Sequence, residues 1–197
     1  MTQERKASSA RARLTGPGMY PAEYARWLLN PLRHLIFPVR SLVRRLKLKP
    51  ADQVLEIGSG PGYFSPAVAR AIPHGTLTLF DAQSEMLAMA EVRLKARGLS
   101  NFDCFEGDAA ALPFADNSFD VAFMVAVLGE VPDRQGAMNE AARVLKPGGR
   151  LVIAELPGDP DFVRRKEVKV RARNAGLTLE RCTGVCCYFI CSFMKAG

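Results

Sequence analysis

The sequence has few of the features that direct a chain into a membrane or out of the cell. No run of about 18 uncharged apolar residues occurs, so we expect no transmembrane helix. Residues 1–13 are polar and basic without an apolar centre, which argues against a secretory signal. We therefore expect a cytoplasmic protein, whose contact with a membrane, if it has one, is confined to the surface.

The sequence also lacks the cysteine spacing that is typical of metal sites. The number of cysteines is odd, and no Cys-x-x-Cys pair is present. We expect no bound metal, and we expect reduced, buried cysteines, as in cytoplasmic proteins. The five cysteines are Cys104, Cys182, Cys186, Cys187 and Cys191.

Acidic residues are scarce in the first quarter of the chain. Residues 1–49 hold 11 Lys and Arg against 2 Asp and Glu, whereas the remainder holds 16 against 18. The net charge of +7 therefore comes from the N-terminal segment. Because the rest of the chain is nearly neutral, we do not expect the whole protein to be a nucleic-acid binder.

The length sets the number of domains. A chain of 197 residues can form one α/β domain with a real core but not two. We expect a disordered basic tail over residues 1–18, since that segment has little to bury. A helical arm should follow over residues 19–49, and one domain over residues 50–197.

The arm carries an apolar stripe with helical spacing, surrounded by arginines and lysines. Asn30 and Pro31 are suited to begin a helix, and Pro38 should kink or split it. Three roles are open: a helical lid packed on the domain, a membrane-surface contact through residues 31–47, or a nucleic-acid contact. The stripe consists of Leu32, Leu35, Ile36, Val39, Leu42, Val43 and Leu46.

A glycine-rich loop follows the first expected strand, Val54 to Ile57. Such a loop before a helix lets a ligand touch the main chain, although it could also be a plain turn. Tyr63 stands where a dinucleotide-binding loop has its third glycine, and a P-loop lysine is missing. The nearby acid Glu56 suits a ligand with an ammonium or sulfonium group.

Strands and helices alternate along the rest of the chain, which predicts a doubly wound sheet with ligands at the carboxyl ends of the strands. Asp81 ends the second expected strand and could accept hydrogen bonds from a ribose or cap the next helix. The acids at or just beyond the expected strand ends are Glu56, Asp81, Asp108, Glu130 and Glu155.

Four segments resemble the class I S-adenosylmethionine-dependent methyltransferases, particularly the branch that includes the ubiquinone and menaquinone C-methyltransferases. They are VLEIGSGPG (54–62), LFDAQSEML (79–87), EGDAAALPFADNSFD (106–120) and RVLKPGGRLVIAE (143–155), in order and at matching spacing. The resemblance implies a Rossmann-like, mostly parallel seven-stranded sheet with an antiparallel last strand, preceded by the helical arm. It also implies S-adenosylmethionine as cofactor.

The resemblance further implies roles for single residues. The glycine loop and Glu56 would hold the methionine part of the cofactor, Asp81 the ribose, and Asp108 the adenine amino group. The full cofactor set is Glu56, Gly58, Ser59, Gly60, Gly62, Asp81, Ala82, Met86, Asp108, Ala109, Met124 and Val125. Tyr20, Tyr24 and Trp27 could roof the site, although ordinary packing of the first helix would also explain them.

The sequence departs from the family after the fourth expected strand, where relatives often carry histidines and this chain reads Leu128-Gly129-Glu130. A base is needed only if the acceptor arrives protonated, and Glu130 and Glu155 are the candidates. We expect methyl transfer to a small, apolar or lipid-like acceptor by in-line displacement. Two alternatives are an RNA methyltransferase that uses the basic arm and a cofactor-binding module without turnover.

Overall fold

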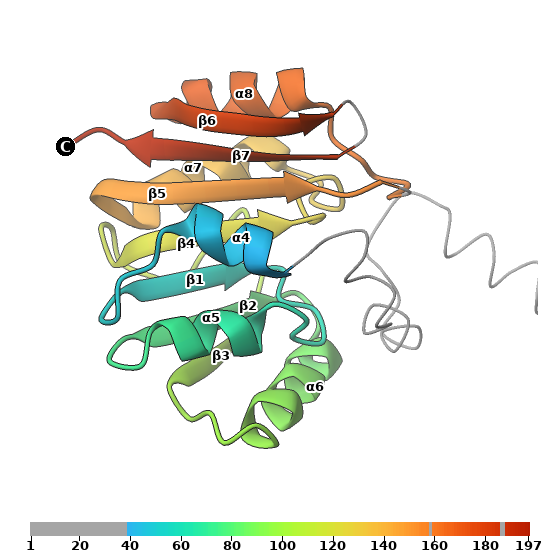
Figure 1. The fold of residues 1–197 in the computed structure, drawn as a ribbon. Coiled ribbons are helices and arrows are strands. Elements are labelled where there is room, and N and C mark those ends of the chain that lie inside the picture. Colours follow the sequence, from blue (N-terminus) through green and yellow to red (C-terminus); the bar gives the residue numbers. More distant parts are fainter. Residues whose placement is uncertain (1–38, 158, 186–187) are drawn as a thin grey trace, which may run out of the picture.

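The computed structural model describes residues 39–157, 159–185 and 188–197, and they form a seven-stranded sheet covered by helices on both faces (Figure 1). The strand order is β3-β2-β1-β4-β5-β7-β6. The strands are β1 (Gln53–Ile57), β2 (Thr76–Asp81), β3 (Phe102–Glu106), β4 (Phe119–Val125), β5 (Leu145–Glu155), β6 (Leu177–Val185) and β7 (Tyr188–Lys195). The described helices are α4 (Val39–Leu46), α5 (Ser65–Ala71), α6 (Ser84–Lys95), α7 (Arg134–Val144) and α8 (Arg165–Asn174).

The strand directions confirm the predicted fold class. Strands β1 to β5 pair in parallel, and β7 runs antiparallel to both β5 and β6. The central strands β1 and β2 are buried after their first residue, because both faces of a parallel sheet are covered by helices. The strands at the two edges, β3 and β6, expose more of their side chains.

Two apolar clusters hold the layers together, one on each face of the sheet. Helices α4, α5 and α6 pack on one face, through side chains such as Leu46, Ile72 and Leu94. Helices α7 and α8 pack on the other face, through Met138 and Val168 among others. Figure 1 shows α4 and α5 in front of the sheet and α7 behind it.

Helix α4, the described end of the arm, is one of the helices that cover the sheet. Helix α4 is described from Val39 onwards, and Pro38, where a kink or break was expected, lies outside the described residues. Its residues Leu42 and Leu46 are fully buried, and Val39 and Val43 pack beside them. This part of the predicted apolar stripe is therefore occupied by the sheet and α5 and is not available to a lipid. The tail and residues 19–38 of the arm lie outside the described residues.

Strands β6 and β7 form an antiparallel hairpin, and two of its cysteines differ from the reduced state that the sequence predicts. Cys182 and Cys191 lie directly opposite each other in the antiparallel pair, with 4.0 Å between their Cα atoms, and form a disulfide. The prediction of reduced cysteines is therefore wrong for this pair, because the strand register brings the two residues together. Cys104 is free and partly buried.

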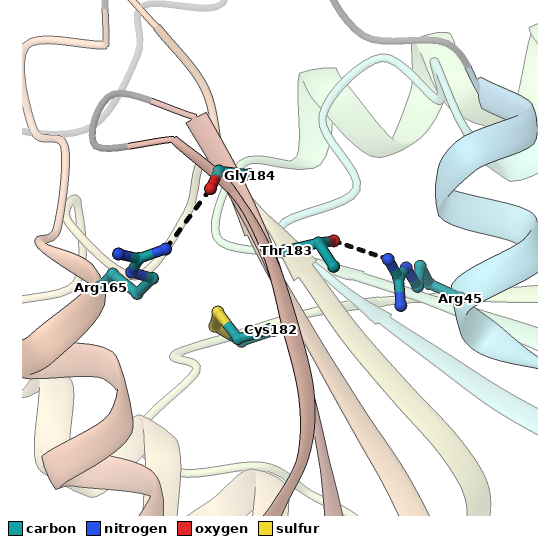
Figure 2. The surroundings of a disulfide bond; sticks show 6 residues. Arg45, Arg165, Cys182, Thr183 and Gly184 are labelled. Carbon is teal, nitrogen blue, oxygen red and sulfur yellow. Dashed lines mark hydrogen bonds between the residues drawn. A yellow bond between two sulfur atoms is a disulfide. The ribbon is translucent and has the colours of Figure 1, made fainter.

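Side chains on β6 alternate between the two layers of helices (Figure 2). Thr183 Oγ1 accepts a hydrogen bond of 2.6 Å from Arg45 of α4, whereas Arg165 of α8 donates to the Gly184 carbonyl at 3.4 Å. Cys182 lies on the α8 side of the strand. The edge strand is thus tied to a helix on each face.

None of the helices within residues 39–157, 159–185 and 188–197 is long and apolar enough to cross a membrane. The same residues contain no group of three or more His, Cys, Asp or Glu side chains placed to hold a metal ion.

Candidate cofactor and acceptor site

The parallel pairing brings the carboxyl ends of the first five strands to one edge of the sheet. Ile57 at the end of β1 pairs with Phe80 on one side and Met124 on the other. Asp81 pairs with Glu106, and Val125 pairs with Ala154. The loops that carry the candidate residues therefore lie side by side at this edge (Figure 1).

The three glycines of the β1–α5 loop all have positive φ, between 51° and 72°, but they face different surroundings. A Cβ at Gly58 would overlap the side chain of Val127, so this glycine lets the loop after β4 come close. A Cβ at Gly62 would lie 3.0 Å from the Cβ of Ala90, so this glycine lets α6 pack. A Cβ at Gly60 would meet nothing within 4 Å, and only here does the loop face open space.

Asp81 connects this open position to the end of β2. Its side chain is only 8% exposed, and its two oxygens accept hydrogen bonds from the Gly60 N–H at 2.7 Å and from the Gln83 N–H at 3.0 Å. Burial raises the pKa of the Asp81 carboxyl, while these main-chain donors oppose the rise. The carboxylate therefore both shapes the glycine loop and lies beside its open face.

Glu56 lies beneath the loop. Its side chain is 3% exposed and accepts a hydrogen bond of 2.6 Å from Ser65 Oγ at the start of α5. Burial raises the pKa of Glu56 to about 8, the Ser65 hydroxyl lowers it, and the charge of Asp81 raises it again. Glu56 is thus mostly protonated at neutral pH, and a cation brought close to it would favour its ionised form.

The candidate adenine-side residues gather around the ends of β2 and β3. The Gly107 N–H donates to the Asp81 carbonyl at 3.0 Å, which joins the loop after β3 to β2. Met86 on α6 is buried. Asp108 is exposed, and its Oδ1 accepts from the Ala110 N–H at 2.8 Å. Ala82 is exposed and Ala109 half-buried at the same edge.

The candidates on β4 lie next to the glycine loop. Met124 is fully buried, whereas Val125 is half-buried at the strand end. The chain then turns through Ala126, which has a positive φ of 55° and donates its N–H to the Ala154 carbonyl at 2.8 Å. This turn carries Val127 to Gly58, a contact that the sequence did not reveal because it joins two loops far apart in the chain.

The two candidate bases lie in a second group, at the ends of β4 and β5. Glu155 is 1% exposed, and its Oε2 accepts from the Val163 N–H at 3.5 Å. Within the described part of the chain, Glu155 Oε1 has no hydrogen-bond partner. Burial raises the pKa of Glu155 to about 8, with further increases from the charges of Asp159 and Glu130 and a decrease from Arg134.

A hollow of about 470 Å³ opens beside these carboxylates, between the loop after β4, the start of α7, and α8. The loop after β4 and the loop after β5 approach each other so closely that a Cβ at Gly129 would overlap the Asp161 carbonyl. Arg134 donates to the Gly129 carbonyl at 2.9 Å and fixes the first loop. The hollow is lined by Gly129, Glu130, Val131, Pro132, Asp133, Arg134, Gln135, Asp161 and Arg171.

The structure thus brings the candidates into two neighbouring groups at one edge of the sheet. Glu130 lines the hollow and Glu155 lies buried near it, while the cofactor candidates surround the glycine loop. The candidate roof residues Tyr20, Tyr24 and Trp27 lie outside the described residues.

Comparison with known proteins agrees with this arrangement. A family model described as a methyltransferase domain matches residues 55–153, half of the chain. The chain is 39% identical over 115 residues to the ubiquinone/menaquinone biosynthesis C-methyltransferase of Ruegeria sp. (strain TM1040), covering 56% of this chain and 46% of that protein. It is 36% identical over 124 residues to the demethylmenaquinone methyltransferase of Geobacillus kaustophilus (strain HTA426), covering 62% and 53%. The chain spans about half the length of these curated relatives.

Solved structures share the fold over more of the chain. A SAM-dependent methyltransferase from Aquifex aeolicus superposes with a TM-score of 0.82 at 24% identity, over 89% of this chain and 99% of that one. The [4+2]-cyclase SpnF superposes with a TM-score of 0.73 at 21% identity, over 80% and 79%, so the fold alone does not fix the reaction. The family match, the strand order and the loop at the end of β1 agree, and the chain belongs to the S-adenosylmethionine-dependent methyltransferase family.

Proposed function

We propose that this protein transfers the methyl group of S-adenosylmethionine to a small, apolar, quinone-like acceptor. The observation that carries the proposal is the open face of the loop at Gly60 beside the buried carboxylate of Asp81, with an acid-lined hollow at the ends of the neighbouring strands. The names of the relatives, which concern ubiquinone and menaquinone biosynthesis, support the acceptor class.

The residues around the loop fit the cofactor. Ser59 Oγ is buried, and no described group is its hydrogen-bond partner, so a polar group of a ligand could satisfy it. Gly60 leaves the main chain open, and Asp81 offers a buried acceptor for hydroxyl groups. When bound, S-adenosylmethionine supplies a methyl group on a positively charged sulfur, from which in-line displacement can remove it.

We assign the binding roles as follows. Glu56 lies close to the methionine ammonium group and helps to hold the loop, and Asp81 accepts from the ribose hydroxyls. Asp108 and the Ala109 N–H contact the adenine edge, and Met86 packs against its ring. The remaining contacts come from Gly58, Ser59, Gly60, Gly62, Ala82, Met124 and Val125.

The acceptor determines whether the protein must also move a proton. Methylation of a ring carbon or of a phenol removes a proton from the acceptor, and a carboxylate can accept it. Glu130 lines the hollow and is the better placed acceptor of that proton. Glu155 is closed off from solvent, and the charge of Glu130 helps to keep it protonated. We further propose that Tyr20, Tyr24 and Trp27 cover the bound acceptor.

The direct test follows a labelled methyl group. The full chain is incubated with S-adenosylmethionine that carries a radioactive methyl group and with a short-tailed demethylnaphthoquinol, with RNA, or with no acceptor. We expect label in the quinol only. Cofactor binding in calorimetry without transfer to any acceptor would identify a binding module, and label in RNA would identify the alternative enzyme.

Replacing Glu130 by Gln tests the proton acceptor. We expect kcat to fall by about 10²- to 10⁴-fold, the range for general base catalysis, with an unchanged Kd for the cofactor. Glu85→Gln, an exposed position on α6, is the matched control and should leave both constants as they are. An unchanged kcat in Glu130→Gln would contradict the assignment.

A further inference from the structure

One edge of the domain, outside the cofactor site, is unusually basic. Between residues 164 and 174, around helix α8, the chain carries six Arg and Lys and a single Glu. That glutamate, Glu167, already pairs with Arg134 and Arg171. Arg164, Arg165 and Lys166 are exposed and form no ion pair with any described residue. Most of the positive charge around this helix is therefore not used in ion pairs of its own.

The positions of these cations are unfavourable for the helix itself. Arg164 occupies the N-cap and makes no capping hydrogen bond, and Arg165 and Lys166 follow in the first turn. The N-terminus of a helix carries the positive end of its dipole, so acids are stabilising there and cations are not. Glu167 in the same turn offsets only part of this positive charge. Cations kept where they oppose helix formation point to a function.

Other cations extend this surface around the end of the edge strand β6. Arg181 on β6 is exposed, and Arg44 and Arg45 of α4 lie on the opposite face of the sheet from α8. Desolvation lowers the pKa of Arg45, and the positive charges of Arg181 and Arg44 lower it further, as expected where cations crowd together. Figure 2 shows Arg45 and Arg165 approaching β6 from its two sides. We call Arg44, Arg45, Arg164, Arg165, Lys166 and Arg181 the basic edge.

Apolar side chains are exposed among these cations. Val185, at the end of β6, is 61% exposed, and Val170 on α8 is exposed as well. Isolated exposed apolar residues are common, but apolar side chains within a basic surface match the boundary between anionic headgroups and lipid chains. They contribute nothing to a contact with phosphates alone.

The basic edge also lies on the side where an acceptor would enter. Helix α8 begins after β5 has ended, so its first turn lies towards the carboxyl ends of the parallel strands, as does the end of β6 (Figure 1). Glu155 and the hollow lie at those same ends.

We propose that the basic edge docks the enzyme on a membrane surface that contains anionic phospholipid. The choice of a membrane over a nucleic acid rests on the exposed apolar residues and, in one respect, on the proposed function, because a quinone-like acceptor is soluble in lipid. Docking at this edge holds the acceptor site against the bilayer. The surface shares Arg44 and Arg45 with residues 31–47, but the described apolar side chains of that segment pack in the domain, so the apolar part of the contact comes from α8 and β6.

Binding to vesicles tests the proposal. The full chain is floated with vesicles of phosphatidylcholine alone and with vesicles that also contain phosphatidylglycerol. We expect binding to the anionic vesicles only, weakened by salt because screening acts on exposed charges. Arg164→Gln with Lys166→Gln should bind roughly 20- to 30-fold more weakly, since each cation at an anionic surface contributes about fivefold.

The matched control removes two exposed cations from the opposite edge of the sheet, Arg70→Gln with Lys95→Gln on α5 and α6. We expect it to bind as the unaltered protein does, and thermal unfolding should show that both variants fold. Equal binding to neutral vesicles, an equal loss in both variants, or tighter binding to polyuridylate than to anionic vesicles would overturn the proposal.

Cofactor affinity and transfer to a water-soluble acceptor separate this proposal from the proposed function. Arg164→Gln with Lys166→Gln should retain both. A protein that binds anionic vesicles through this edge but transfers no methyl group would refute the proposed function and leave the docking surface standing.

Discussion

Two glutamates, Glu56 and Glu155, are buried at the ends of β1 and β5, and each has a pKa raised to about 8. The main cause in both is the loss of water around the ionised form. The folded protein therefore keeps two protons near pH 7 that the unfolded chain releases, since the ordinary pKa is 4.5. This stabilising contribution is complete below pH 4.5 and is lost as the pH rises towards 8.

Replacing Glu155 by Gln should remove one of the two groups that hold a proton near pH 7 only in the folded protein. We expect the free energy of unfolding of the unaltered protein to fall between about pH 5 and 8, and we expect the variant to have a slope smaller by up to about 1.4 kcal/mol per pH unit. Urea unfolding at several pH values measures this. Glu106→Gln, at an exposed position, should leave the slope unchanged, and equal slopes in both variants would contradict the pKa of Glu155.

Asp81 is the residue on which cofactor binding should depend most. Asp81→Ala removes hydrogen-bond acceptors for the ribose and should raise the Kd by roughly five- to 150-fold, which is about 1–3 kcal/mol of binding free energy. Asp81→Asn keeps one oxygen that can accept from the Gly60 N–H and should lose less. Titration calorimetry with S-adenosylmethionine measures both.

Asp103 of β3, which is exposed, supplies the control for Asp81. Asp103→Ala should bind the cofactor normally. If Asp81→Ala also bound it normally, the ribose contact would have to come from another residue.

At the scale of elements, the β6–β7 hairpin is closed by the disulfide between Cys182 and Cys191, nine positions apart in the chain. A cross-link of this span stabilises mainly by restricting the unfolded chain, by roughly 2–3 kcal/mol. We expect a reducing agent to lower the free energy of unfolding of the unaltered protein by this amount.

Cysteine variants show whether this pair is responsible. Cys182→Ser should be destabilised to the same degree and should no longer respond to the reducing agent. Cys104→Ser, which leaves the pair intact, should respond as the unaltered protein does. A response that persists in Cys182→Ser would place the sensitive disulfide elsewhere.

The whole molecule is a sheet between two apolar layers, and α4 belongs to one of them. Its carboxyl end is tied to the far edge by the ion pair of 2.7 Å between Lys47 and Glu180. Leu42 and Leu46 contribute to the same cluster as α5. The described end of the arm therefore packs in the core, and we expect the folded unit to include it.

Truncation tests where the folded unit begins. Removing residues 1–38 should change the free energy of unfolding by less than about 1 kcal/mol if α4 is the first element of the core. Removing residues 1–47 should destabilise much more, because emptying the place of a buried leucine costs about 2–5 kcal/mol. Leu46→Ala in the full chain should show that cost alone, with exposed Arg40→Ala as control. A large loss in the shorter truncation would show that residues before α4 stabilise the domain.

Much of this fold is determined locally and could be predicted. The sequence pattern predicts strands over residues 76–81 and roughly 102–106 and a helix from near Ser84, and β2, β3 and α6 lie there. Continuous apolar runs and turn residues act within a few positions of the chain. The pattern predicts the fifth strand only over residues 150–155, after a turn at 146–149. Strand β5 begins earlier, since its Leu145 pairs with Phe119 across a bulge. The carboxylates at the strand ends could be found in the sequence for the same reason, because each lies at or just beyond the end of an expected strand.

The sequence by itself determined the resemblance to a family with a mostly parallel sheet and an antiparallel last strand, the glycine loop and the acids that follow the strands. Only the tertiary structure decided that Val127 fills the space at Gly58, that Cys182 faces Cys191, and that one face of α4 is buried. It also decided the raised pKa values of Glu56 and Glu155. The physical reason is that register, close approach and desolvation depend on atoms distant in the chain, and a local pattern carries no information about them.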